Sequence, residues 1–198
     1  MTLRTVRIVL WLLVALALAG AAYLFLVRPT QPLASGPAVT IGAPFTLTGT
    51  DGKPFSSDAL KGRPHVIFFG FTHCPDVCPT TLARLAKLRR ETGLGEEAFD
   101  IVLVTADPER DTPPALADYV AMFGTPITAL TGTPQQIAAV AKSFGIFIEK
   151  VPDPAGGYTV DHSSQVLLFN RDGTFAGTIA LEETDAPALQ KLRNIAES

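Results

Sequence analysis

Cysteine is scarce in this sequence, and its scarcity excludes one large class of exported proteins. The 198 residues include only two cysteines, Cys74 and Cys78. Two cysteines cannot make the multiple disulfide bonds of a small secreted scaffold, and a bridge between residues so close in sequence would add little stability. The pair is therefore better explained by thiol chemistry than by a structural cross-link.

Charge is absent from a long stretch near the N-terminus. From Ile8 to Val27, twenty residues carry no charged side chain. In a helix, such a stretch spans about 30 Å, the thickness of the hydrocarbon core of a bilayer. Trp11 and Tyr23 lie near its two ends, where aromatic rings favour the membrane interface. The stretch therefore predicts an N-terminal transmembrane helix.

The flanking charges predict the orientation of this helix. Arg4 and Arg7 precede it and only Arg28 follows it closely, so the positive-inside rule places the N-terminus in the cytoplasm or matrix. Ala17-Leu18-Ala19 has the small-x-small form of a cleavage site, and a cleaved signal peptide is the alternative. Because the apolar run continues to Val27, we favour an uncleaved signal anchor. Both interpretations export the remainder of the chain.

Three segments follow from these patterns. Residues 1–28 are predicted to be the anchor, with the transmembrane helix at about 8–27. Residues 29–40 are predicted to be a linker, because the stretch from Pro29 to Pro37 is rich in proline, serine, glycine and other small residues. Residues 41–198 then form a single exported domain.

Basic residues are few in the exported part. Residues 1–28 contain three of the 16 basic side chains and no acidic ones, which leaves 13 basic against 19 acidic residues beyond them and a formal charge of −6. A surface with this charge does not attract the phosphate backbone of nucleic acids. We therefore exclude nucleic acid as a partner.

The hydrophobic pattern beyond the linker predicts an α/β domain with a mixed central sheet. A turn at Asp51-Gly52 joins the first two strands, and residues 152–158 are rich in turn residues, which indicates a mobile surface loop leading to His162. Leu82, Leu85 and Leu88 mark an amphipathic helix after the cysteines, with the nearby basic residues largely off its apolar stripe. The predicted strands are 45–47, 53–55, 66–69, 99–104, 127–130, 146–151, 165–169 and 175–179, and the other predicted helices are 115–123, 134–144 and 186–196.

The two cysteines lie in the loop between the predicted strand 66–69 and this helix. If the first helical turn begins within the loop, Cys74 and Cys78 are four residues apart on one face. The N-terminus of a helix favours a thiolate over a thiol. Buried free cysteines are an alternative, but the pairing indicates either a redox dithiol or soft ligands for a metal ion.

The order strand, cysteine loop, helix and later hairpin is the layout of a thioredoxin-like fold. Redox members of that superfamily carry Cys-x-x-Cys, whereas three residues separate Cys74 from Cys78. The extra residue changes the loop geometry, which weakens the dithiol-exchange interpretation without excluding it. His162, just before the strand 165–169, is a third candidate. Two thiolates and one imidazole suit copper, Cu(I) especially, and a trigonal site of this kind could also hold Cu(II).

Three motifs in the exported domain resemble those of the Sco/SenC family. They are Gly70-Phe71-Thr72-His73-Cys74-Pro75-Asp76-Val77-Cys78-Pro79, Asp107-Pro108-Glu109-Arg110-Asp111-Thr112-Pro113 and Asp161-His162-Ser163-Ser164. Members of this family are membrane-anchored copper chaperones with a thioredoxin fold, which help to assemble the binuclear copper site of cytochrome c oxidase. The N-terminal anchor agrees with the resemblance, which covers nearly all of the exported domain.

The resemblance implies a site, partners and a location. It implies that Cys74, Cys78 and His162 are the copper ligands. The implied partners are the oxidase subunit that holds the copper site, other copper chaperones and the membrane itself. The implied location is the bacterial inner membrane with the domain in the periplasm, or the mitochondrial inner membrane facing the intermembrane space. Copper requires both thiols to be reduced and deprotonated, so metal binding and disulfide formation exclude each other.

The primary expectation is a metallochaperone and not an enzyme. The first alternative is a thiol-disulfide oxidoreductase that keeps the cysteines of the oxidase copper site reduced, which would need the cysteine pair but not His162. A second is a peroxidase-like relative with Cys74 as the attacking thiolate and Cys78 as its resolving partner, although no peroxide-specific feature supports it. A third is a redox or copper sensor that reports its state through a partner.

Several other residues are weaker candidates for a role at the site. Asp107 is either a contact in the second shell of the metal site or a weak axial ligand, or else it begins a turn. Asp111-Thr112 are expected to cap the following helix. His73 is expected to have a positioning or exposed role and His65 a structural one. Met122 falls on an apolar stripe and is expected in the core.

Overall fold

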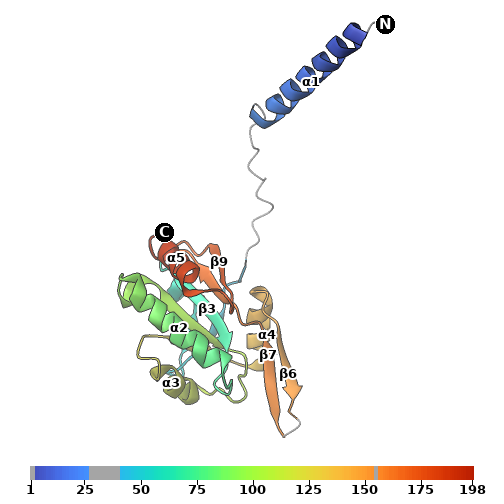
Figure 1. Cartoon of the computed structure of the whole chain (residues 1–198). Helices are drawn as coiled ribbons and strands as arrows, with labels where there is room; N and C mark the ends of the chain where they lie inside the picture. The colour runs from blue at the N-terminus through green and yellow to red at the C-terminus, as the bar shows by residue number, and fades with distance from the viewer. Residues whose placement is uncertain (1–2, 27–40, 154–155) are drawn as a thin grey trace. The chain divides into compact units, whose positions relative to one another are not determined.

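The computed structural model describes residues 3–26, 41–153 and 156–198, and the chain divides into two compact units, Met1–Val39 and Thr40–Ser198. In the first unit the described residues form a helix, α1 (Leu3–Leu26), which covers most of the predicted transmembrane stretch (Figure 1). Over the described residues, no helix combines the length and the apolar character needed to cross a membrane. The predicted transmembrane helix is therefore not confirmed, and the predicted linker, residues 29–40, lies entirely outside the described residues.

The second unit is built on a mixed sheet with the strand order β2-β1-β5-β4-β3-β8-β9. The three central strands, β3, β4 and β5, run parallel, and antiparallel neighbours extend the sheet on both sides. This confirms the predicted α/β architecture with a mixed central sheet. The strands are β1 (Thr46–Gly49), β2 (Pro54–Ser56), β3 (His65–Gly70), β4 (Asp100–Thr105), β5 (Thr128–Thr131), β8 (Val166–Phe169) and β9 (Phe175–Ile179).

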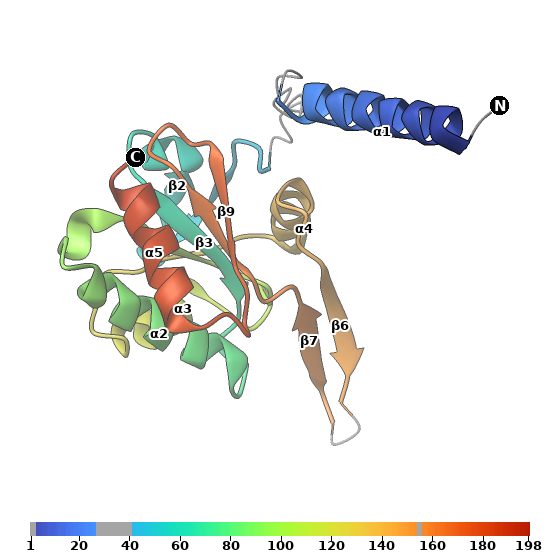
Figure 2. The same ribbon diagram turned by 45° about the horizontal axis from the view of Figure 1, so that its top comes forward.

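Helices cover both faces of this sheet (Figures 1 and 2). Alternate residues of β3 point to opposite faces, as in any strand. Phe68 packs in the cluster formed with α2, α3 and α5, and Phe69 packs in the cluster formed with α4. All six residues of β3 are buried, as expected of a central strand. The helices are α2 (Val77–Thr92), α3 (Pro113–Ala121), α4 (Pro134–Ser143) and α5 (Asp185–Ala196), with short 3-10 turns at Ser57–Leu60 and Glu96–Ala98.

The α2 helix follows its predicted apolar stripe with one exception. Leu82, Leu85 and Leu88 are buried, and Gly93 ends the helix with a φ of 76°. Arg89, expected with the other basic residues largely off the stripe, is also buried. Its guanidinium group donates hydrogen bonds to the carbonyl oxygens of Phe99 and Pro126. These partners, distant in sequence, compensate the burial of the charge.

The predicted surface loop 152–158 lies at the tip of a hairpin, where the described residues 153, 156 and 157 are outside strands, but the strand that follows it and ends at His162 was not predicted. β6 (Ile148–Pro152) and β7 (Tyr158–His162) form an antiparallel hairpin that pairs Pro152 with Tyr158 and Ile148 with His162. Tyrosine, threonine and valine favour strands, and the glycines that precede them masked this preference in the sequence. His162 is therefore held at the end of a strand, and residues 154 and 155 lie outside the described residues.

Met122 was also placed wrongly, because its side chain is 70% exposed. The α3 helix ends at Ala121, and Met122 is its C-cap residue. Because α3 ends before Met122, the helical spacing that predicted its burial does not extend to this residue. Tyr119, three residues earlier and within α3, is buried and stacks edge-on with Phe123 at 5.4 Å between ring centroids.

Candidate functional site

The cysteine loop leaves the sheet at the end of β3, beside the loop that follows β4. The parallel register pairs Gly70 with Thr105, the last residues of the two strands. The carboxyl ends of parallel neighbours lie at the same edge of a sheet, where ligand sites of α/β folds commonly form. The motifs that begin at Gly70 and at Asp107 are thus adjacent in the folded chain.

Cys74 lies just before α2 and takes the place of a capping side chain. Asp76, the N-cap residue, makes no side-chain cap hydrogen bond. Instead, the backbone N–H of Cys78 donates to the Cys74 sulfur at 3.3 Å. The sulfur thus satisfies one of the N–H groups that have no main-chain partner at the start of a helix. Cys74 itself is half-buried.

Cys78 lies in the first turn of α2 and is fully buried. Burial is the main cause that raises the pKa of its thiol, and the nearby Cys74 adds to this effect. The main chain of β3 passes very close to the sulfur, since a Cβ atom placed on Gly70 would lie 3.1 Å from it. Only glycine fits at this position without a shift of its neighbours, a requirement that no local pattern in the sequence reveals.

His162 approaches Cys78 from the β6–β7 hairpin. Its Nε2 atom lies 3.6 Å from the Cys78 sulfur, and its Nδ1 atom lies 2.9 Å from the carbonyl oxygen of Ser163. A carbonyl oxygen can only accept, so the proton of the neutral ring belongs on Nδ1 and the Nε2 lone pair faces the thiol. Phe68 and Phe71 meet the ring edge-on at 6.1 and 5.7 Å. Burial lowers the pKa of His162 and keeps the ring neutral.

The structure therefore brings Cys78 close to both other predicted ligands. Cys74, Pro75 and Val77 line a shallow hollow together with His162 and Asp161. Across the described part of the chain, no three His, Cys, Asp or Glu side chains are already arranged to hold a metal ion. The three predicted ligands meet at one place, but their side chains are not in a finished metal geometry.

Asp111 anchors the cysteine loop, a role that was not predicted from the sequence. The carboxylate is fully buried. It accepts hydrogen bonds from the backbone N–H of Thr72 at 3.1 Å and from the hydroxyl groups of Thr72 and Thr105, each at 2.6 Å. The expected helix cap is supplied by Thr112, whose hydroxyl oxygen accepts from Ala115. The spacing of the motif does not distinguish a residue that caps a helix from one that ties two loops together.

Asp107 is also fully buried, but its described contacts are with the hairpin and its own loop. Its carboxylate accepts hydrogen bonds from the Tyr158 hydroxyl group and from the Arg110 guanidinium group. These contacts satisfy a buried charge and leave the carboxylate bound to protein groups.

The other histidines have the roles that were expected of them. The His73 side chain is 53% exposed, and its Nδ1 atom lies 2.9 Å from the Thr72 hydroxyl oxygen. The His65 ring is buried and stacks on Phe169 at 5.0 Å between centroids. His65 is thus a structural residue of β3, away from the cysteine loop.

Comparison with known proteins places this geometry in a family. The SCO1/SenC family model matches residues 34–197. A SCO2-like protein of Rickettsia conorii is 38% identical over 186 residues, which cover 88% of this chain and 90% of that protein. The copper-bound structure of ScoI from Bradyrhizobium japonicum is 39% identical, with a TM-score of 0.71, and covers 78% of this chain and 99% of its own.

A second solved structure is also similar to this chain. BsSco, in which a disulfide switch was identified, is described as a member of the Sco family of cytochrome c oxidase assembly proteins. It is 26% identical, with a TM-score of 0.63, over 81% of this chain and 96% of its own. The matched residues include all three motifs of the sequence, and the mixed sheet agrees with the thioredoxin-like fold of these structures. The chain is a member of the SCO1/SenC family.

Proposed function

We propose that this protein binds copper through Cys74, Cys78 and His162 and delivers it to the copper-site subunit of a cytochrome c oxidase. The observation that carries the proposal is the 3.6 Å approach of the His162 Nε2 atom to the Cys78 sulfur, with Nδ1 occupied by a backbone carbonyl group. The copper bound to the related ScoI supports the choice of metal. The description of BsSco supports cytochrome c oxidase assembly as the process.

The three side chains have complementary tasks in this proposal. Thiolates are the soft ligands that Cu(I) prefers, and a neutral imidazole completes a low-coordinate set that also accommodates Cu(II). Burial keeps Cys78 protonated in the metal-free protein, so binding of copper must release its proton. His162 presents an unprotonated nitrogen without any change of tautomer.

The different exposure of the two cysteines indicates which copper ligand is exchanged first. Cys78 is fully buried, whereas Cys74 is partly exposed and lines the hollow at the surface. An incoming ligand of the partner reaches Cys74 first, so copper leaves by exchange of the Cys74 thiolate for a donor of the partner. Other copper chaperones would load the site by the reverse exchange.

An anaerobic Cu(I) titration of the reduced full-length protein tests this function, with affinity measured by competition against a chelator. The expected result is one copper ion per chain. His162→Ala should lower the affinity by more than about tenfold, since even outer partners of metal ligands are worth 10- to 100-fold. His73→Ala is the matched control, because this exposed histidine adjoins Cys74. Binding that does not depend on His162 would contradict the proposal.

A second candidate function is a thiol-disulfide oxidoreductase. The observation that favours it is the half-exposed Cys74 at the start of α2, with the buried Cys78 four residues later. The Cys74 thiolate would attack a target disulfide, and Cys78 would then displace the target, which leaves with both its sulfurs reduced while this pair becomes a disulfide. Reduction of a model disulfide that persists in His162→Ala and disappears in Cys74→Ser would favour this function.

We also propose that residues 1–28 anchor the protein in a membrane, that residues 29–40 are a linker, and that residues 41–198 form the copper-binding domain. The absence of charged side chains from Ile8 to Val27 and the preceding Arg4 and Arg7 support this arrangement. The domain would face the bacterial periplasm or the mitochondrial intermembrane space. Sedimentation with membranes after alkaline carbonate extraction, combined with protection from protease on the cytoplasmic side, tests both points.

A further inference from the structure

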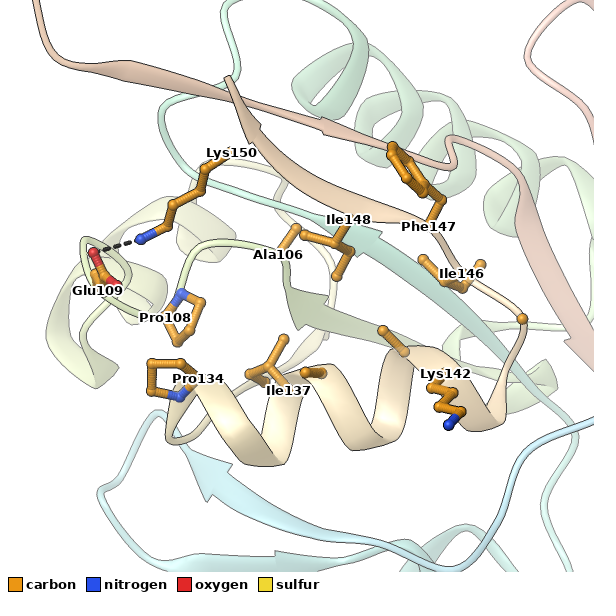
Figure 3. Close-up of a pocket in the computed structure, with 13 residues that line it drawn as sticks. Ala106, Pro108, Glu109, Pro134, Ile137, Lys142, Ile146, Phe147, Ile148 and Lys150 are labelled. Carbon is orange, nitrogen blue, oxygen red and sulfur yellow. Dashed lines mark ion pairs between the residues drawn. The ribbon is translucent and has the colours of Figure 1, made fainter. Parts of the chain in front are cut away.

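The hairpin that carries His162 is not part of the main sheet. β6 and β7 form a sheet of their own, and Figure 2 shows them projecting beside the central strands. Between β6 and α4 lies a hollow of about 460 Å³, lined mainly by apolar side chains that include Ile137, Ile146 and Ile148 (Figure 3). Because this side of the hairpin is incompletely packed, other contacts must fix its position.

Those contacts come from the loop after β4. The Tyr158 hydroxyl group, at the start of β7, donates to the Asp107 carboxylate at 2.9 Å. The Arg110 guanidinium group donates through Nε to the same carboxylate, and through Nη1 to the backbone carbonyl oxygen of Tyr158 at 3.2 Å. It also lies over the Tyr158 ring, with Cζ 4.0 Å from the ring centroid. We call Asp107, Arg110 and Tyr158 the clamp.

A second contact joins the same two segments. Lys150 of β6 pairs with Glu109 at 2.5 Å, as the dashed line in Figure 3 shows. Both side chains are about half exposed, and exposed ion pairs contribute little. The clamp differs because the Asp107 carboxylate is fully buried. Loss of a partner there leaves a buried charge unpaired, so the clamp and not the Lys150–Glu109 pair dominates the contact.

One short segment therefore holds both halves of the site. Asp107 and Arg110 bind the hairpin that bears His162, and Asp111 binds Thr72 in the cysteine loop. We propose that Arg110 and Tyr158 are positioning residues, which hold the β6–β7 hairpin so that His162 faces Cys78. Neither is a ligand; they act on the metal site only through the hairpin. The expected effect on copper rests on the proposed function, whereas the effect on the hairpin does not.

The first test measures amide hydrogen exchange in the reduced, metal-free, full-length protein. Tyr158→Leu and Arg110→Met should each accelerate exchange in residues 158–162 by about tenfold or more, because exchange reports local opening, while exchange in α2 stays unchanged. Lys142→Met is the matched control, since Lys142 lines the same hollow and contacts no clamp residue among the contacts described. Two clamp variants are used because Arg110→Met removes the cationic partner of the buried Asp107 carboxylate and also weakens the fold.

The second test measures Cu(I) affinity in a double-mutant cycle. Each clamp variant should lower the affinity about tenfold when His162 is present, as expected for loss of an outer-shell partner, and should have no further effect in the His162→Ala background. Unchanged exchange at residues 158–162, or an equal loss of affinity in both backgrounds, would overturn the positioning role. If the unaltered protein binds no copper, the proposed function fails, and the exchange measurement alone decides on the clamp.

Discussion

The Nε2 atom of His162 lies 3.6 Å from the buried sulfur of Cys78, although 84 positions separate the two residues in the sequence. The Nδ1 atom binds the Ser163 carbonyl oxygen, so the second nitrogen of the ring has a free lone pair. In the metal-free protein this lone pair can only accept the thiol proton of Cys78. A soft cation that replaces this proton finds both donors already facing each other.

The two thiols should differ strongly in reactivity. Cys78 is fully buried, and burial raises its pKa, so at neutral pH its nucleophilic thiolate is rare. In the Cys74→Ser variant, iodoacetamide should therefore modify the remaining thiol at least about tenfold more slowly than in Cys78→Ser. The rate for Cys78 should still be rising at pH 9. Mass spectrometry over time measures both rates, and equal rates at pH 7 would contradict this interpretation of the site.

Asp111 should contribute to the stability of the cysteine loop. Asp111→Asn weakens charge-assisted hydrogen bonds from Thr72 and Thr105, and we expect unfolding in urea to require roughly 1–3 kcal/mol less free energy. The loosened loop should also make Cys74 react faster with iodoacetamide. Asp58→Asn is the control, because the described contact of the Asp58 carboxylate is an exposed ion pair with Lys61, so this change should have little effect. A stability equal to that of the unaltered protein would show that the loop is held by other contacts.

Gly70 should not tolerate even one methyl group. The added Cβ atom would lie 2.7 Å from the Phe68 ring and 3.1 Å from the Cys78 sulfur. Overpacking of this kind typically costs about 1–3 kcal/mol, and the displaced sulfur should weaken copper binding in parallel. Gly49→Ala is the matched control in a strand, since its nearest neighbour is the flexible side chain of Asp51. Equal thermal stability of the two variants would contradict the prediction.

His65 should make folding sensitive to mild acid. Burial lowers its pKa below the ordinary value of 6.5 and outweighs the opposing effects of the Arg63 carbonyl group and Asp100. Below pH 6.5 the unfolded chain therefore binds a proton that the folded chain rejects, and stability falls as the pH decreases. Urea unfolding at pH 7.5 and 5.5 should show this loss. His65→Gln should reduce it but not abolish it, because the pKa of His162 is shifted in the same direction.

The chosen pH interval separates the effect of the histidines from that of the acidic residues. Acidic groups whose pKa is lowered in the folded protein, such as Glu183 beside Lys191, lose their contribution only at lower pH. The interval from pH 7.5 to 5.5 therefore isolates the histidines. An unchanged slope in His65→Gln would show that His65 is protonated in the folded protein despite its burial.

Local sequence patterns predicted most of the sheet and helices. The continuous apolar run 66–69 became the buried β3, and the leucine spacing after the cysteines became α2. These predictions succeed because the hydrophobic pattern that indicates a strand or a helix is formed by residues close together in the sequence. Arg89 shows the limit of such patterns. Its basic side chain is buried because carbonyl groups of Phe99 and Pro126 receive it, and those partners are adjacent only in the folded chain.

Sequence patterns likewise predicted only part of the candidate site. Its chemical groups, Cys74, Cys78 and His162, follow from residue type and from the resemblance of their motifs. The residues that position them do not. Asp111 and Arg110 lie in one motif with Asp107, yet nothing in their spacing reveals that one binds the cysteine loop and the other the hairpin. These roles depend on the parallel pairing of β3 with β4.

The pairing of Gly70 with Thr105 has a consequence for how this chain can evolve. The cysteine loop and the loop that bears Asp107 and Asp111 start from the same edge of the sheet, so their lengths must match. Adding or deleting one residue between Gly70 and Cys74, or between Thr105 and Asp111, would separate the two loops without altering any functional side chain. Chain length in these two intervals is therefore as constrained as residue identity.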